Sequence, residues 1–344
     1  MRARNARPAP QTGASRDWGP SGRLALDLRR GINDERLAFG KQLGCSDVVA
    51  GPWCLPQDRE KGFYDLKSLV ELKKRVEAAG MALAAVENVY FEWYDRIARG
   101  QPGRDQQIEN WQKTLRNMGE AKIPVLGYHF MALGVWRTSG TKLGRGGAQV
   151  TSYDHSLVKG APVPDWGPLS DDQMWDNVTY FLKAVIPVAE QAGVKMGLHP
   201  DDPPVPSIGG VARIFRSHAA LRRLTEEICP SEFNGLEFCQ GTVSEMPDDV
   251  YEAISYFGTR KKIFYVHFRN VSGKVPVFDE TFIDEGYVDM YRAMQIYKDV
   301  GFDGPMIDDH VPKIVDDNAW DGPYRSEAYA MGYYKAFIDV LRRS

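Results

Sequence analysis

Four residues with metal-binding side chains each follow a short apolar run. His199, Cys239, His267 and Asp309 lie in LHPDD, LEFCQ, YVHFRN and PMIDDH. Two imidazoles, a thiolate and a carboxylate can hold a divalent ion and leave positions open for substrate, and the soft thiolate favours a transition metal. A buried cysteine alone is usually a small apolar core residue. Four such residues after four successive apolar runs instead indicate a metal site, and His310, directly after Asp309, is placed to act as a general acid or base.

The elements that must position these residues are short apolar runs that alternate with charged segments of helical period. The helical segments span residues 65–80, 107–122, 174–193 and 288–301, and three of the four end at a glycine suited to a left-handed C-cap. Eight runs are predicted to be strands: Leu24–Leu28, Asp47–Ala50, Leu83–Glu87, Val125–Phe130, Lys195–His199, Gly235–Cys239, Ile263–His267 and Gly304–Ile307.

Eight strand and helix units in a chain of 344 residues favour a closed (β/α)₈ barrel, a TIM barrel, over an open doubly wound sheet. The first strand is not followed by GxGxxG or GxxxxGK[ST], which argues against a nucleotide-binding fold. Catalytic groups of such barrels lie at the carboxyl ends of the strands. We therefore expect the four metal-binding residues to meet at one end of the barrel.

One connection is much longer than the others. Residues 131–171 show no convincing periodicity and are rich in Gly, Ser and Pro, so we expect a long loop after the fourth strand that acts as a lid. Trp136 and Arg137 near its start could reach an anionic substrate. The alternative is a tolerated surface insertion.

Composition excludes several classes of protein. The formal charge is −3 with both signs interspersed, which does not suit a nucleic-acid surface. Four cysteines without CxxC spacing predict free thiols and a cytoplasmic protein. Residues 1–22 lack an apolar signal or membrane segment and are expected to be a disordered leader to a single domain over 23–344. The arginine-rich start also suits a transit peptide, but its prolines argue against the required helix.

Several sequence segments of the chain resemble those of the mannonate dehydratases. The likeness is carried by LHPDDPPVPSIGGVARI, by FLKAVIPVAEQAGVKMGLHP before it, and by WQKTLRNMGEAKIPVLGYHFM, WRTSG, NGLEFCQGT and IFYVHFRNV in the family order. The resemblance implies a TIM-barrel lyase that requires Mn²⁺, or another divalent transition metal, and dehydrates D-mannonate to 2-keto-3-deoxy-D-gluconate.

The resemblance also assigns roles to residues. It implies that His199, Cys239, His267 and Asp309 bind the metal, that His310 is the catalytic histidine, and that the catalytic tyrosine falls, with a gap, on Tyr324. The partners expected are a small sugar acid and further copies of the chain.

The expected substrate contacts come from residues near the same strand ends. Arg269 could add positive charge to a carboxylate clamp. His129, Trp136 and Arg137 are further candidates, together with Asp201 and Asp202, whose DDPP turn could equally be structural.

Three departures from the family pattern concern the substrate rather than the metal. Pro52, Trp53 and Cys54 replace a TALxxIP-like segment, LALDLRR lacks the usual aromatic start, and Gly134 with Val135 replaces an expected Asp. A related sugar acid is therefore a possible substrate. Two other classes stay open: a metal-dependent sugar isomerase, epimerase or lyase, for which Glu237 would share the pore-facing side of Cys239, and a sugar-binding barrel without activity.

Overall fold

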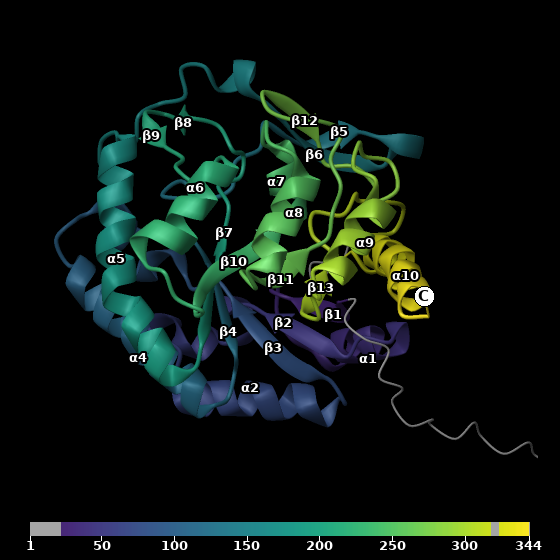
Figure 1. Ribbon diagram of the computed structural model, residues 1–344, viewed down its shortest axis with the longest axis horizontal. Coiled ribbons are helices and arrows are strands. Elements are labelled where there is room, and N and C mark those ends of the chain that lie inside the picture. The colour runs from purple at the N-terminus through teal and green to yellow at the C-terminus, as the bar shows by residue number, and fades with distance from the viewer. Residues whose placement is uncertain (1–21, 318–322, 344) are drawn as a thin grey trace, which may run out of the picture.

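The computed structural model describes residues 22–317 and 323–343, so the expected leader, apart from Gly22, lies outside the described residues. Eight parallel strands close into a barrel in the order β1-β13-β11-β10-β7-β4-β3-β2, with helices around it (Figure 1). The barrel strands are β1 (Arg23–Leu28), β2 (Asp47–Ala50), β3 (Ala82–Glu87), β4 (Val125–His129), β7 (Lys195–His199), β10 (Asn234–Cys239), β11 (Ile263–His267) and β13 (Pro305–Ile307). The predicted TIM barrel is confirmed, because all eight predicted strands are barrel strands.

Helices connect successive strands and bury their apolar faces against the barrel. They are α1 (Asp34–Leu43), α2 (Leu66–Ala78), α3 (Asp95–Arg99), α4 (Arg104–Glu120), α5 (Asp171–Ala192), α6 (His218–Arg222), α7 (Gln240–Glu245), α8 (Val250–Thr259), α9 (Met290–Asp299) and α10 (Tyr324–Leu341). The predicted glycine caps are confirmed, since Gly80, Gly193 and Gly301 have φ of 77°, 68° and 69°. Ser170 begins α5 with a capping box that pairs it with Gln173, which sets the start of this helix.

The strand register brings the predicted ligands to one level of the barrel. His129 on β4 is opposite His199 on β7, and Cys239 on β10 is opposite His267 on β11. Since parallel strands all end on the same side, these residues form a layer at the carboxyl end of the barrel.

The long connection after β4 is more ordered than an irregular loop. It contains β5 (Ser139–Leu143) and β6 (Gln149–Asp154), which form an antiparallel sheet with β12 (Val277–Asp279), and the three strands lie together at one edge of the molecule in Figure 1. Tyr153 and Phe278, which are register partners, form a small apolar core with Val205 and Ile208. The connection over 131–171 is therefore long, as expected, but it contains two strands that its weak pattern did not predict, because pairing with a strand distant in sequence orders these residues. Its role as a lid stays a prediction. A two-stranded ribbon of β8 (Ser207–Ile208) and β9 (Val211–Ala212) follows β7.

Helix hydropathy and the state of the cysteines are two further properties of the described residues. Within residues 22–317 and 323–343, no helix combines the length and apolar character needed to cross a membrane. All four cysteines are free, as predicted.

Candidate active site

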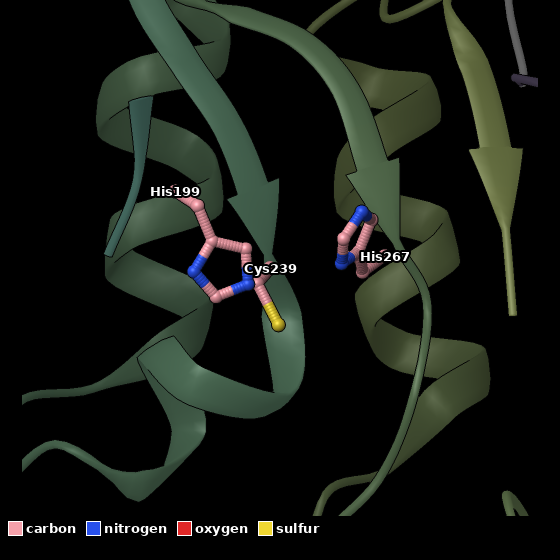
Figure 2. Close-up of side chains that lie close together, drawn as sticks. All are labelled: His199, Cys239 and His267. Atoms are coloured by element: carbon pink, nitrogen blue, oxygen red, sulfur yellow. The ribbon is translucent and has the colours of Figure 1, made fainter. Parts of the chain in front are cut away.

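Three of the four predicted metal ligands meet at the carboxyl ends of adjacent strands. One ligand atom from each of His199, Cys239 and His267 lies within 4.8 Å of the others, and all three side chains are buried. Figure 2 shows the Cys239 sulfur between the two imidazole rings, whose centroids are 5.4 Å apart. The strand register therefore builds a compact nitrogen and sulfur donor set.

Hydrogen bonds to the outer ring nitrogens leave one nitrogen of each imidazole for the cluster. His199 Nδ1 lies 2.6 Å from the Pro200 carbonyl oxygen, which can only accept, so Nδ1 carries a proton and Nε2 is the nitrogen left for the cluster. Burial alone would lower the pKa of His199, but Cys239 raises it to about 9, so a metal ion bound at Nε2 would displace a proton there. His267 Nε2 lies 2.9 Å from a Glu87 carboxylate oxygen, and its Nδ1 is buried without a hydrogen-bond partner. Metal-bound histidines commonly use a backbone carbonyl or a carboxylate in this way, so the residues fit a divalent ion.

The electrostatics of the cluster favour a thiolate. Burial alone would raise the pKa of Cys239, but Arg269 and His199 outweigh it and lower this pKa well below its usual range. Burial alone would lower the pKa of His267, but Glu87 and Asp309 raise it well above its usual range. A metal ion bound here would displace a proton from His267, which couples its affinity to pH.

Asp309, the fourth predicted ligand, lies beside the cluster and is held by two arginines. Its Oδ1 accepts from Arg29 Nη2 at 2.7 Å, and its Oδ2 accepts from Arg269 Nε at 3.0 Å. Oδ2 is also 3.5 Å from His267 Nδ1. These arginines make the Asp309 carboxylate a weaker ligand for a metal ion, but they fix its position next to the cluster.

Two buried glutamates, Glu87 and Glu237, lie next to His267, and neither was predicted as a metal ligand or catalytic residue. Glu87 closes β3, the same strand-end position that singled out the metal ligands, so the sequence did carry a signal for it. Glu237 Oε1 is 3.1 Å from His267 Nε2, and Glu237 Oε2 accepts from the Tyr265 hydroxyl. Burial and then the neighbouring Glu87 raise the pKa of Glu237 to about 8, which keeps it largely protonated at neutral pH. Glu237 faces the barrel interior as predicted, and there its carboxyl oxygens contact Tyr265 and His267.

His310, the predicted acid or base, lies at the edge of the buried layer. Its Nδ1 is 2.5 Å from Glu280 Oε1, and its Nε2 is 3.7 Å from Asp309 Oδ1. Its φ of 46° lies in the left-handed region, which a non-glycine residue adopts only when its surroundings require it. Such strain is common at functional positions.

A cavity of about 520 Å³ opens next to these groups. Asp309, His310 and His129 line it, together with Glu87 and several residues of the first three strand–helix connections. Burial lowers the pKa of His129 to about 3, so its ring is neutral and can exchange a hydrogen bond with a hydroxyl group. The His129 ring is also within 3.2 Å of the Tyr94 hydroxyl.

Exposed cations line the same cavity. Arg30 and Arg59 are both exposed, and Arg59 lies over the ring of Tyr90 at 5.1 Å. Trp53, from the segment that departs from the family pattern, forms part of the wall and is 55% exposed. Pro52 and Trp53, two residues of that departure, therefore line the cavity.

The predicted substrate arginines are bonded to protein carboxylates. Arg269 donates to Asp309 at 3.0 Å, to Glu245 at 3.1 Å and to Asp202 at 3.2 Å. Arg137 donates to Asp202 at 2.5 and 2.7 Å. The terminal nitrogens of both arginines thus bind carboxylates inside the protein. Arg30 and Arg59 are more exposed partners for a substrate carboxylate, although Arg59 Nε already donates to Glu92 Oε1 at 2.6 Å.

Asp201, Asp202 and Trp136 organise the turn after β7. Asp201 Oδ2 accepts from the backbone N–H of Phe215 at 2.7 Å, and the backbone N–H of Trp136 donates to the Asp202 carbonyl at 3.2 Å. Such contacts are those expected if the DDPP turn has a structural role. The orienting partner of His199 is the Pro200 carbonyl, which lies in the same turn.

Tyr324 is the first residue of α10 and directly follows the undescribed residues 318–322 and Pro323. Its ring packs edge-on against Phe39 at 4.9 Å, with the Arg36 guanidinium 5.0 Å from its centroid. The structure does not bring its ring into the cluster of His199, Cys239 and His267, and its catalytic role stays a prediction.

A closed barrel with buried ionisable side chains and a cavity at the carboxyl ends of its strands defines a TIM-barrel enzyme. The family model described as D-mannonate dehydratase (UxuA) matches residues 33–166 and 163–343. The chain belongs to the mannonate dehydratase family and is a hydro-lyase.

Individual relatives agree with this assignment. The mannonate dehydratase of Streptococcus suis strain 05ZYH33 is 32% identical over 331 residues, with 88% of each chain covered. Mannonate dehydratase 2 of Halalkalibacterium halodurans is 32% identical over 322 residues, which cover 85% of this chain and 88% of the relative. The crystal structure of mannonate dehydratase from Streptococcus suis serotype 2 has a TM-score of 0.85 at 30% identity and covers 94% of this chain and 95% of its own. An L-ribulose 3-epimerase structure shares the fold, with a TM-score of 0.60 at 15% identity over 94% of this chain and 96% of its own.

Proposed function

We propose that this protein removes water from a sugar acid, converting D-mannonate or a related aldonate to a 2-keto-3-deoxy acid, with Mn²⁺ or another divalent transition ion as cofactor. The observation that carries the proposal is the buried set of His199, Cys239 and His267. Its His267 is 3.5 Å from Asp309, which lines a cavity together with His310. Family membership supports the reaction class.

The reaction needs a proton removed next to a carboxylate and a hydroxyl expelled from the neighbouring carbon. The electron pair of the broken C–H bond becomes a carbon–carbon double bond, and the pair of the broken C–O bond leaves with the hydroxyl, which takes up a proton to become water. The resulting enol tautomerises to the ketone. A bound divalent ion would supply Lewis-acid stabilisation of the negative charge that develops beside the carboxylate.

The residues of the chain supply binding and proton transfer. Arg30 and Arg59 provide positive charge for the substrate carboxylate, and neutral His129 provides a hydrogen-bond partner for a hydroxyl. His310 Nε2 moves the proton, because Nδ1 is engaged by Glu280.

The test is to incubate the purified protein with a panel of aldonic acids, D-mannonate included, with Mn²⁺ or with a chelator. We expect mass spectrometry to show a 2-keto-3-deoxy acid that has lost one water, and we expect the chelator to stop its formation. A product of unchanged mass would instead show isomerisation or epimerisation. Binding of a panel member without turnover would show a sugar-binding barrel, and either result would overturn the proposal.

A further inference from the structure

Glu280 is a buried carboxylate that contacts the proposed catalytic histidine from another part of the chain. It follows β12 and is 1% exposed, and its Oε1 lies 2.5 Å from His310 Nδ1. No strand-end pattern or motif marks this residue in the sequence. Its contact with His310 exists only because the β12 segment folds back over the barrel.

The other partners of Glu280 indicate where the proton lies. Its Oε1 also accepts from Arg137 Nη2, and its Oε2 accepts from the Thr151 hydroxyl. Arg137 Nη2 is 3.4 Å from His310 Nδ1, much farther than the carboxylate. A carboxylate oxygen and an unprotonated nitrogen would repel at 2.5 Å, so Nδ1 carries a proton that it donates to Glu280.

This arrangement determines which nitrogen of His310 can react. With Nδ1–H bonded to Glu280, the lone pair of the neutral ring is on Nε2, and His310 lines the cavity. A histidine base held by a carboxylate through its second nitrogen is the arrangement that gives a triad its correct tautomer. The left-handed backbone of His310 provides a second sign that the surroundings hold this residue in place.

We propose that Glu280 is a positioning residue for His310, fixing its Nδ1–H tautomer, and that it fastens the segment of residues 131–171 to the catalytic histidine. The second part follows because Arg137 and Thr151, both in that segment, bind the same carboxylate. The backbone N–H of Glu280 also donates to the Thr151 carbonyl at 2.9 Å. The inference rests on the proposed function insofar as His310 moves a proton.

The test compares Glu280→Gln with a matched control, Asp279→Asn. Gln keeps the shape of Glu but can donate as well as accept, so it no longer dictates the tautomer of His310. Asp279 is the neighbouring acid, and its carboxylate pairs with the exposed Lys142 at 2.7 Å, away from His310. Thr151→Val is a third variant, which removes the hydroxyl bond to Glu280 Oε2 and leaves Oε1 in contact with His310.

The first readout does not depend on activity. The chain has six histidines, few enough for selective ¹⁵N labelling to resolve the ring nitrogens, and the signal missing from His310→Asn identifies His310. We expect the Nδ1–H tautomer in the wild type, in Asp279→Asn and in Thr151→Val, measured with diamagnetic Zn²⁺ at a pH where the ring is neutral. We expect a mixture of tautomers in Glu280→Gln. An Nε2–H ring in the wild type, or an unchanged ring in Glu280→Gln, would overturn the proposal even if no substrate had been found.

The second readout is kinetic. The substrate is the sugar acid that the panel identifies. We expect Glu280→Gln to lose roughly 10²–10⁴-fold in kcat, the range that proton transfer by a correctly positioned side chain supplies. Its KM should stay within about twofold of the wild-type value, and its metal content should be unchanged. Thr151→Val should retain most of the wild-type kcat. A wild-type kcat in Glu280→Gln, or a loss that follows the loss of metal, would overturn the proposal. A panel without turnover would overturn the proposed function, and the NMR comparison would still decide the role of Glu280.

Discussion

Arg29 is the cation that the buried acids at the carboxyl end of the barrel share. It donates to Asp27 at 2.9 and 3.0 Å, to Glu87 at 2.7 Å and to Asp309 at 2.7 Å. The side chains of Arg29, Glu87 and Asp309 are 21%, 1% and 3% exposed. Replacement by methionine keeps an unbranched side chain and removes the charge, so it leaves these carboxylates without their common partner.

The magnitude follows from this burial. Removing one partner of a buried ion pair typically destabilises a protein by about 3–5 kcal/mol, because the other charge is left uncompensated. With an entropy of unfolding of about 2.1 cal/mol/K per residue, a chain of 344 residues should lose about 4–7 °C in Tm. The measurement is thermal unfolding of the Arg29→Met variant in a chelator, so that a bound metal ion does not stabilise the carboxylates.

The matched control for Arg29→Met is Arg75→Met. Arg75 pairs with Asp34 at 2.8 Å, but these side chains are 45% and 94% exposed, and such a pair contributes about 0–1 kcal/mol. We expect the control to unfold within about 1 °C of the wild type. Equal Tm values for the two variants would refute the argument that Arg29 compensates the buried acids.

Three further predictions concern the metal, the proton and the barrel interior. Cys239→Ser should reduce the metal content from about one divalent ion per chain to near zero by elemental analysis, since the thiolate is the soft donor; full occupancy would contradict this. His310→Asn should keep the metal and lose roughly 10²–10⁴-fold in kcat. Asp309→Asn should instead weaken metal binding, and its activity should return in part at high Mn²⁺. Loss of metal in His310→Asn would count against the assignment of proton transfer to His310 and metal binding to Asp309. Gly127→Ala would place a Cβ 1.8 Å from the Tyr265 hydroxyl, so urea unfolding should show a loss of about 1–3 kcal/mol, and an unchanged midpoint would show that the interior can yield.

The sequence by itself determined the barrel and the level at which its predicted metal ligands meet. A strand of a closed parallel barrel is covered on its outer face and packed on its inner face, so it reads as a short apolar run; Leu83–Glu87 was predicted, and β3 is Ala82–Glu87. Because all strands of such a barrel end on one side, the strand-end positions of His199, Cys239 and His267 predicted their proximity. Glu87 ends β3, so its place in the same layer also followed from its strand-end position.

Tertiary structure alone decided which charges are paired and which segments are ordered. Arg29 and Asp309 lie 280 residues apart, and Glu280 meets His310 through the fold of β12, so neither contact leaves a local pattern. The sheet over the barrel is another case, because the partner of Tyr153 is Phe278, more than a hundred residues away. Periodicity records whether a residue is buried but not which residue it meets there, and hydrogen bonds between buried charges depend on that second fact.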